Sequence, residues 1–185
     1  MSKRRLLIVV DYQNDFVTGS LGFEEAEQIE EALCEKICEA RAEGVDLLFT
    51  LDTHEEDYLE TQEGRKLPVP HCIRETSGWE LCESAAALRE GAPLLEKSSF
   101  GSAELIRFLQ DGKYESVELC GVVTSICVLS NAVLAKAALP EAEILIDARA
   151  TADSSEKLRQ ETFDLMERLQ MTVLHREQSE YSRHT

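Results

Sequence analysis

A cysteine just after a short apolar stretch is the clearest candidate nucleophile in the chain. Cys127 ends the sequence Gly121-Val-Val-Thr-Ser-Ile-Cys, between the apolar residues 117–119 and the start of a helical pattern. At the first turn of a helix, unpaired backbone N–H groups and the helix dipole favour a thiolate over a thiol and can bind an oxyanion. Free cysteines are also common as small buried side chains, so position alone leaves a packing role open.

Charged side chains follow other predicted strands. Asp11 comes directly after residues 6–10, and Lys97 comes shortly after residues 94–95. Ligands of parallel α/β sheets bind beyond the carboxyl ends of the strands, so these side chains and Cys127 are expected at one edge. A carboxylate, an amine and a thiol together supply a base, a cation and a nucleophile. Taken singly, Asp11 could cap a turn and Lys97 could be solvated. The occurrence of both residues and of Cys127 at the ends of predicted strands nevertheless favours a catalytic group.

Two histidines and an aspartate have the spacing of metal ligands. Asp52 and His54, after the strand expected at 45–51, are separated by one residue, so in an extended segment both side chains point to the same side. His71 lies just beyond the polar stretch 53–70 and can supply a third ligand. Mixed nitrogen and oxygen ligands suit zinc, iron or manganese. Carboxylates are abundant in this acidic chain, so a surface role for the aspartate stays open.

Strand-like and helix-like patterns alternate along the chain. Residues 6–10 are apolar throughout, as in a central parallel strand that is covered on both faces. Residues 53–70 lack clean periodicity and carry turn signals, which indicates a long functional loop. The alternation predicts a three-layer α/β/α (Rossmann-like) fold with a mostly parallel sheet of about six strands flanked by helices. Strands are expected at residues 6–10, 45–51, 94–95, 117–119, 144–146 and 172–174, and helices at 24–43, 79–89, 102–110 (capped by Ser102), 127–138 and 154–170.

Composition limits the class of protein. A chain of 185 residues is long enough for one substantial domain, expected over residues 1–185, and is short for two. Its 36 acidic residues against 19 basic residues give a formal charge of -17, which opposes binding to nucleic acids and to anionic membranes. No stretch has the roughly 20 apolar residues of a membrane span, and no small-residue cleavage site follows Lys3-Arg4-Arg5. We therefore expect a soluble cytoplasmic protein whose six cysteines are reduced.

Five motifs occur in order along nearly the whole chain: Val-Val-Asp11-Tyr-Gln-Asn-Asp-Phe16, Asp52-Thr-His54, Pro70-His71-Cys-Ile, Glu96-Lys97-Ser-Ser-Phe-Gly-Ser and Gly121-Val-Val-Thr-Ser-Ile-Cys127-Val. Together they resemble the isochorismatase-like cysteine hydrolases, in particular the nicotinamidase-related branch. The resemblance implies that Asp11, Lys97 and Cys127 form a catalytic triad. It also implies a cis peptide bond between Val122 and Val123, and an oxyanion hole formed by the backbone N–H groups of Val123 and Cys127.

The resemblance further implies a divalent metal. Nicotinamidases bind one through an Asp-x-His pair, a later histidine, and a histidine or glutamate in the intervening loop. The position eight after Asp52 is Glu60, which is therefore the expected fourth ligand, with Glu56 and Glu63 as alternatives. Zinc is the expected ion, with iron or manganese as alternatives, and the expected ligands are Asp52, His54, His71 and Glu60.

The implied activity is hydrolysis of the C–N bond of a small planar amide through a cysteine thioester, as in the conversion of nicotinamide to nicotinic acid and ammonia. A carbamoyl or ureido amidohydrolase with the same triad is the main alternative, and a catalytically silent binding protein on this fold is another. The isochorismatase branch cleaves a vinyl ether and typically lacks the cysteine, so Cys127 argues against that reaction. Ser125 and Glu75 depart from the nicotinamidase pattern and weaken the choice of substrate.

Residues that flank the catalytic motifs are expected to shape the substrate pocket. Phe16 and Gln13 follow Asp11, and Val122 precedes Cys127 by five positions. All three are therefore candidates to face a small-molecule amide substrate. Members of the family commonly assemble, so a homo-oligomer is expected, with neither a nucleic acid nor a membrane as a partner.

Overall fold

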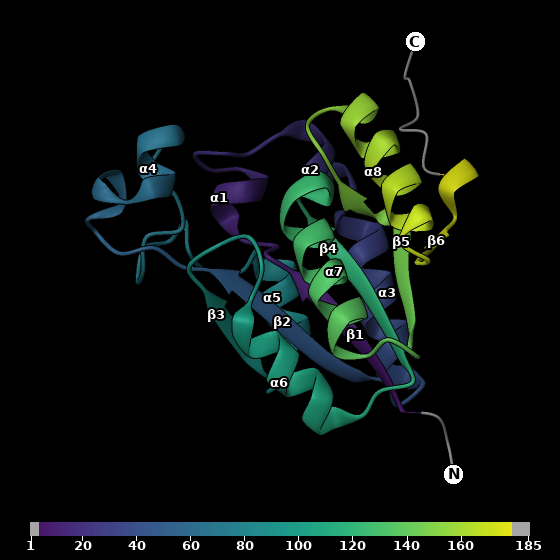
Figure 1. Ribbon diagram of the computed structural model, residues 1–185. Helices are drawn as coiled ribbons and strands as arrows, with labels where there is room; N and C mark the ends of the chain where they lie inside the picture. Colours follow the sequence, from purple (N-terminus) through teal and green to yellow (C-terminus); the bar gives the residue numbers. More distant parts are fainter. Residues whose placement is uncertain (1–3, 179–185) are drawn as a thin grey trace.

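The chain is built around one six-stranded sheet (Figure 1). The computed structural model describes residues 4–178. The strands are β1 (Arg5–Val10), β2 (Asp46–Asp52), β3 (Leu94–Lys97), β4 (Ser116–Val122), β5 (Glu143–Ala152) and β6 (Thr172–Leu174). They are all parallel and lie in the order β3-β2-β1-β4-β5-β6, so the order of the sheet reverses beside β1. The predicted parallel α/β fold is confirmed.

Helices cover both faces of the sheet and give it three layers (Figure 1). One core, beneath α6, α7 and α8, contains Ile8 and Leu119, and the other, beneath α2, α3 and α5, contains Val9 and Phe49. Within residues 4–178, none of the helices combines the length and the apolar composition that a bilayer crossing requires. The helices are α1 (Asn14–Val17), α2 (Glu24–Gln28), α3 (Glu30–Ala42), α4 (Gln62–Lys66), α5 (Glu83–Arg89), α6 (Ala103–Gly112), α7 (Leu129–Ala138) and α8 (Glu156–Arg168), with helical turns η1 (Tyr58–Glu60), η2 (Thr124–Val128) and η3 (Arg176–Gln178).

The ends of several elements differ from the expected ones. Strand β5, expected at 144–146, extends to Ala152. The helix expected at 24–43 is divided into α2 and α3 by a turn at Ile29, whose side chain is buried. The helix expected from Trp79 begins only at Glu83, because Trp79 lies in the preceding segment, where its indole N–H donates to the Thr53 hydroxyl at 2.8 Å. Ser102 occupies the N-cap position of α6, but its side chain makes no capping hydrogen bond. Patterns of apolar residues thus located the helices better than their ends.

The segment expected as a loop at 53–70 contains two short helical elements, η1 and α4. Thr61 caps α4 by accepting a hydrogen bond from the N–H of Gly64 at 3.0 Å. Each element is too short for a helical period to be recognised in the sequence. Figure 1 shows that α4 stands away from the sheet at the edge where the carboxyl ends of β1 and β2 lie. The helix therefore places this part of the segment 53–70 beyond the carboxyl ends of the two strands.

A glycine allows β1 and β4 to approach closely where both strands end. Gly121 pairs with Val10 in the parallel ladder and has a φ of 107°. A Cβ at this position would lie only 2.1 Å from the carbonyl oxygen of Val10. Since Asp11 follows Val10 directly, this contact also fixes the spacing between Asp11 and the turn that carries Cys127.

Replacing Gly121 with alanine is therefore expected to destabilise the protein by more than about 1 kcal/mol, because the new methyl group meets both a positive φ and a backbone oxygen. Urea unfolding measures the loss. Gly91→Ala is a matched control, since Gly91 has a φ of 83° but nothing within 4 Å of its would-be Cβ. A loss in Gly121→Ala no larger than in Gly91→Ala would contradict a steric requirement at the strand ends.

Candidate active site

Asp11 and Lys97 meet at the carboxyl edge of the sheet. Asp11 follows β1 with a φ of 48° and is fully buried. Its Oδ1 accepts a hydrogen bond from the Thr50 hydroxyl at 2.7 Å, and its Oδ2 lies 2.7 Å from Nζ of Lys97 at the end of β3. Thr50, on the intervening strand β2, therefore orients the carboxylate. Sequence reasoning missed Thr50, although a hydroxyl inside an otherwise apolar strand is a signal for such a role.

The ammonium group of Lys97 links the carboxylates to the candidate nucleophile. Its Nζ lies 3.1 Å from Oδ1 of Asp52 and donates to the carbonyl oxygen of Ser99 at 3.1 Å. The Sγ of Cys127 lies 3.7 Å from the same nitrogen. The structure thus brings together the acid, the amine and the thiol that were expected at neighbouring strand ends.

Cys127 lies in a π-helical turn rather than at the first position of an α-helix. The turn is η2, and α7 begins two residues after the cysteine, at Leu129. The carbonyl of Val123 accepts hydrogen bonds from the N–H groups of Ile126 and Val128, both at 3.1 Å, and the N–H of Ser125 donates to Oδ2 of Asp153 at 2.9 Å. The peptide bond between Val122 and Val123 is cis.

Burial determines which of these groups carry charge. Burial raises the pKa of the Cys127 thiol well above its usual value, and although Lys97 lowers it in part, a hydrogen bond to Asp11 raises it again. Burial also raises the pKa of Asp11, with a partial opposing effect of Lys97. Burial would lower the pKa of Lys97, but the adjacent Asp11, Cys127 and Asp52 raise it. Desolvation of Cys127 therefore opposes the thiolate that the helix end was expected to favour.

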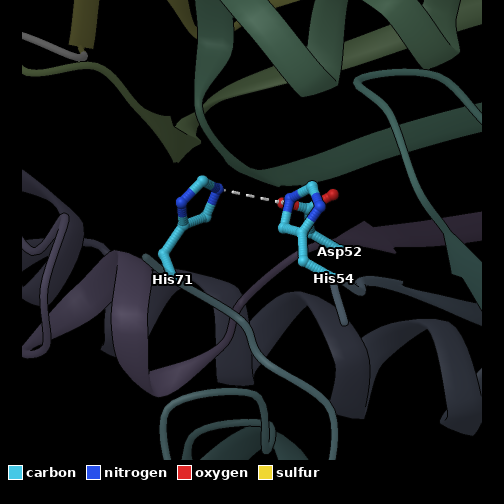
Figure 2. A group of neighbouring side chains, drawn as sticks. All are labelled: Asp52, His54 and His71. Carbon is cyan, nitrogen blue, oxygen red and sulfur yellow. Dashed lines mark hydrogen bonds and ion pairs between the residues drawn. The ribbon is translucent and has the colours of Figure 1, made fainter. Parts of the chain in front are cut away.

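Asp52, His54 and His71 form a second group that shares Asp52 with the first (Figure 2). Oδ2 of Asp52 lies 3.1 Å from Nε2 of His54 and 3.4 Å from Nε2 of His71. All three residues are buried, and one possible ligand atom from each lies within 4.8 Å of the others. Burial alone would raise the pKa of Asp52, but its hydrogen bonds to His54 and His71 and the charge of Lys97 lower it below its usual value. An ionised carboxylate thus faces two imidazole nitrogens.

The surroundings of the two imidazoles prepare them to bind a metal. The carbonyl of Val69 lies 2.9 Å from Nδ1 of His71, so a neutral ring carries its proton on Nδ1 and offers Nε2 as a ligand. The ring of Tyr58 packs against both histidines, with centroid distances of 4.7 Å to His54 and 5.0 Å to His71. Phe16 packs edge-on against His71 at 5.6 Å. A nitrogen and oxygen donor set held in this way fits zinc, iron or manganese.

Glu63 extends this group from α4. Its Oε1 lies 3.9 Å from Nε2 of His54 and 3.8 Å from Nε2 of His71. Glu60, the fourth ligand expected from the resemblance, is the last residue of η1, and its side chain is exposed. The side chain of Glu56, which precedes η1, is exposed as well. Within residues 4–178, Glu60 forms no ion pair with either histidine, so the structure does not bring it to the group. The turn from η1 into α4 directs Glu63 inward instead.

The residues expected in the substrate pocket have other contacts. Gln13 is fully buried and accepts a hydrogen bond from the N–H of Asp52 at 2.7 Å, while its Nε2 donates to the carbonyls of Asp52 at 2.9 Å and Trp79 at 2.7 Å. Gln13 thus orients the backbone of Asp52. Phe16 contacts His71, and Val122 lies in the apolar core on the side of α3. None of the three is among the residues that line the cleft described below, so their expected role in the substrate pocket stays a prediction.

A cleft of about 1200 Å³ opens beside the two groups, and Lys97 and His54 lie on its wall. Phe100 and Ile126 line it as well and are about half exposed, at 45% and 43%. Its remaining lining comes mainly from the segment 53–67 and from residues 94–104. Its volume is at least that of known small-molecule sites, roughly 300–1,000 Å³. The cleft is therefore large enough for a small substrate, and Nζ of Lys97 on its wall lies 3.7 Å from Sγ of Cys127.

Comparison with known proteins identifies the family. Residues 5–178 match the family described as the Isochorismatase domain. The chain is also 34% identical over 142 residues to an uncharacterized isochorismatase family protein, PncA, from Bacillus subtilis (strain 168). That alignment covers 70% of this chain and 77% of the relative.

Solved structures of similar proteins have the same fold. The pyrazinamidase/nicotinamidase of Streptococcus mutans UA159 superposes with a TM-score of 0.83 at 28% identity and covers 92% of this chain and 99% of its own. The pyrazinamidase of Pyrococcus horikoshii in complex with zinc superposes with a TM-score of 0.78 at 25% identity and covers 92% of this chain and 98% of its own. The chain therefore belongs to the isochorismatase family, in its nicotinamidase-related part, and is a hydrolase.

Proposed function

We propose that the protein is a cysteine amidohydrolase that converts a small planar amide to the corresponding carboxylic acid and ammonia. The proposed substrate is nicotinamide. One observation carries the proposal. Nζ of Lys97 contacts Asp11, Asp52 and Cys127 at once, at 2.7, 3.1 and 3.7 Å, and Asp52 also contacts both histidines. A base, a cation and a nucleophile therefore adjoin a candidate metal-binding group, and Lys97 and His54 from these groups line a cleft. Hydrolysis of a C–N bond requires such a combination.

In the proposed reaction, Asp11 takes the proton of the Cys127 thiol as the sulfur attacks the amide carbonyl carbon. Lys97 stabilises the negative charge that develops on the sulfur. The N–H groups of Val123 and Cys127 hold the tetrahedral oxyanion, a contribution of about 3–4 kcal/mol per donor in other acyl-transfer enzymes. Asp11 then protonates the departing ammonia, which leaves a thioester. Asp11 next deprotonates a water molecule, whose oxygen attacks the thioester carbon. The acid departs, and Asp11 returns the proton to the sulfur of Cys127, which restores the thiol.

Burial of the group suits this use of Asp11. A carboxylate whose pKa is raised by burial is a stronger base than one in water, and it lies next to the thiol whose proton it must accept. Lys97 stays protonated between the carboxylates, so it supplies a fixed positive charge. The proton of the thiol therefore moves only during attack, and the sulfur does not need to be ionised at rest.

We also propose that Asp52, His54, His71 and Glu63 bind a divalent metal, with zinc preferred and iron or manganese accepted. The support is the geometry of their ligand atoms and the zinc complex of the Pyrococcus horikoshii pyrazinamidase. When bound, such an ion supplies a Lewis acid that can hold a water molecule or a ring nitrogen of the substrate.

The choice of Glu63 over Glu60 leads to a direct prediction. Glu63→Gln should weaken zinc binding to metal-stripped, untagged protein by on the order of 10-fold or more, because it replaces a charged ligand with a neutral amide. Glu60→Gln is the matched control and should bind zinc like the wild type, since its side chain is exposed. Isothermal titration calorimetry measures both. Equal affinities in Glu63→Gln and the wild type, with a loss in Glu60→Gln, would restore the original assignment.

Charges on the cleft wall favour a neutral amide over a substrate that carries its own carboxylate. Arg74 on this wall is already paired with Glu55 at 2.9 Å and with Glu96 at 2.7 Å. An N-carbamoyl amino acid would bring a further negative charge into the cleft, whereas nicotinamide is neutral. This favours the nicotinamidase-like activity over the carbamoyl amidohydrolase alternative. The carboxylates on the wall are those of Glu55, Asp57, Glu63, Glu96 and Glu104, and the cations are Lys66, Arg74 and Lys97.

Ammonia release tests the proposal. Nicotinamide, pyrazinamide and a set of N-carbamoyl amino acids are compared with the wild-type protein, first metal-stripped and then supplemented with zinc, iron or manganese. We expect the two neutral amides to release ammonia and the N-carbamoyl amino acids to release little. Faster turnover of the N-carbamoyl amino acids would support the carbamoyl alternative, and no turnover of any amide would contradict the proposed function.

A further inference from the structure

One buried amide connects the turn that carries Cys127 to the segment that follows Lys97. Asn131 lies on α7, four residues after Cys127, and is fully buried. Its Nδ2 donates to the carbonyl of Cys127 at 2.8 Å and to the carbonyl of Phe100 at 3.1 Å, and its Oδ1 accepts from the N–H of Ser102 at 3.1 Å. An asparagine side chain has two donor hydrogens and one acceptor oxygen, so both of its polar atoms are engaged.

The segment held by Asn131 is itself tied to Lys97. Residues 98–102 connect β3 to α6, and the carbonyl of Ser99 accepts a hydrogen bond from Nζ of Lys97 at 3.1 Å. The same segment packs closely on α7, because a Cβ at Gly101 would lie 2.8 Å from Cδ1 of Leu134. It also places Phe100 on the wall of the cleft. Its position is thus fixed from two sides.

These contacts form a closed circuit around the two reacting groups. It runs from Lys97 through Ser99 and Phe100 to Asn131, and from Asn131 to the carbonyl of Cys127. It closes across the 3.7 Å between Nζ of Lys97 and Sγ of Cys127. The side chain of Asn131 donates to the backbone carbonyl of Cys127 itself. A displacement of Asn131 therefore moves the backbone of the proposed nucleophile directly. Changes of about 1 Å at a reacting centre can cost about 10²-fold in rate.

We propose that Asn131 is a positioning residue that sets the separation between the thiol of Cys127 and the ammonium of Lys97, and that also fixes the cleft segment bearing Phe100. Asn131 does not act on the substrate itself. The effect on turnover rests on the proposed role of Cys127 as nucleophile, whereas the effect on geometry does not.

The test compares Asn131→Val with Asn131→Thr, two variants of nearly equal shape that differ in one hydroxyl. A threonine hydroxyl on a helix can donate to the carbonyl four residues earlier, which here is that of Cys127. Valine has no such donor. Thr162→Val on α8 is the control for general destabilisation, because it removes a buried hydroxyl bond of the same kind, to the carbonyl of Leu158 at 2.7 Å, far along the chain from the site.

Crystal structures and steady-state kinetics of the three variants are compared with those of the wild type. We expect Asn131→Val to show a longer distance between Nζ and Sγ and a kcat at least about tenfold lower, with a smaller change in KM. Asn131→Thr keeps only the bond to the carbonyl of Cys127, so it should restore part of both values, and Thr162→Val should change neither. An unchanged Nζ to Sγ distance in Asn131→Val, or a displacement in Asn131→Thr as large as in Asn131→Val, would overturn the inference. If the wild type hydrolyses no amide, the proposed function fails, and the crystal structures still decide the role of Asn131.

Discussion

Replacing Cys127 with alanine should abolish amide hydrolysis and leave the fold intact. The thiol is the proposed nucleophile, and the loss of a nucleophile in a catalytic triad lowers turnover by several orders of magnitude, on the order of 10⁴-fold or more. The fold should survive because alanine removes one sulfur atom from a core whose neighbouring residues on α7, Ala132 and Ala135, are already small. Ammonia release measures the first effect, and circular dichroism with thermal unfolding measures the second.

Cys120→Ala is the matched control for this experiment. Cys120 is also a fully buried free cysteine, but it lies within β4 in the core on the other face of the sheet. The control variant should therefore lose some stability and keep its activity. If Cys127→Ala hydrolysed every active substrate at close to the wild-type rate, the sulfur would not be the nucleophile. A similar loss of activity in Cys120→Ala would point instead to a general effect of removing buried thiols.

Replacing Lys97 with methionine should destabilise the protein and inactivate it together. The side chain of Lys97 is 1% exposed and lies between the carboxylates of Asp11 and Asp52, which are 0% and 6% exposed. Methionine fills a similar volume but leaves two buried negative charges without their shared cation. Breaking a buried ion pair by removing one partner costs about 3–5 kcal/mol. Urea unfolding at neutral pH measures the loss.

The double variant Lys97→Met/Asp11→Asn separates the two effects. Neutralising Asp11 removes one of the uncompensated charges, so the double variant should recover part of the stability that Lys97→Met loses, while it remains inactive because the proposed base is gone. Lys157→Met is the control for removing a lysine, since the side chain of Lys157 is 84% exposed and its ion pair with Glu161 should contribute less than about 0.5 kcal/mol. A stability loss in Lys97→Met no greater than in Lys157→Met would contradict the charge arrangement described here.

The proposed catalytic group could be predicted from the sequence because the fold itself places strand ends together. Once an alternating α/β pattern indicates a parallel sheet, residues that follow different strands must meet at one edge. To place Asp11 and Lys97 at this edge, it was enough to recognise the strands that precede them, and the exact ends of these strands were not required. The strand ending at Lys97 was expected at 94–95 and extends to 97, and Nζ of Lys97 still lies 2.7 Å from Oδ2 of Asp11.

The proposed fourth metal ligand could not be predicted in the same way. It depends on how a segment without regular periodicity folds, and a count of residues from Asp52 led to Glu60. The cap at Thr61 starts α4, and this short helix directs Glu63 toward the histidines. Glu63 was among the alternatives, but no signal in the sequence distinguished it from its neighbours.

Contacts between segments that are far apart in the chain could not be predicted from the sequence either. Gln13 bonds to the backbone of Asp52, and Asn131 bonds to residues 100 and 102, in each case across a separation that only the three-dimensional register reveals. The protonation of Cys127 depends on burial from all sides, which a local argument about helix ends cannot include. The sequence therefore identified candidate residues, and the structure shows how their side chains are oriented.

The proposed thioester at Cys127 can be detected directly by mass spectrometry of protein that is quenched with acid during turnover of nicotinamide. We expect a fraction of the protein to carry a nicotinoyl group that peptide mapping locates on Cys127, that hydroxylamine releases and that is absent from Cys127→Ala. Hydrolysis that proceeds with no acyl group on the protein at any quench time, or with the acyl group on another residue, would contradict a thioester mechanism at Cys127.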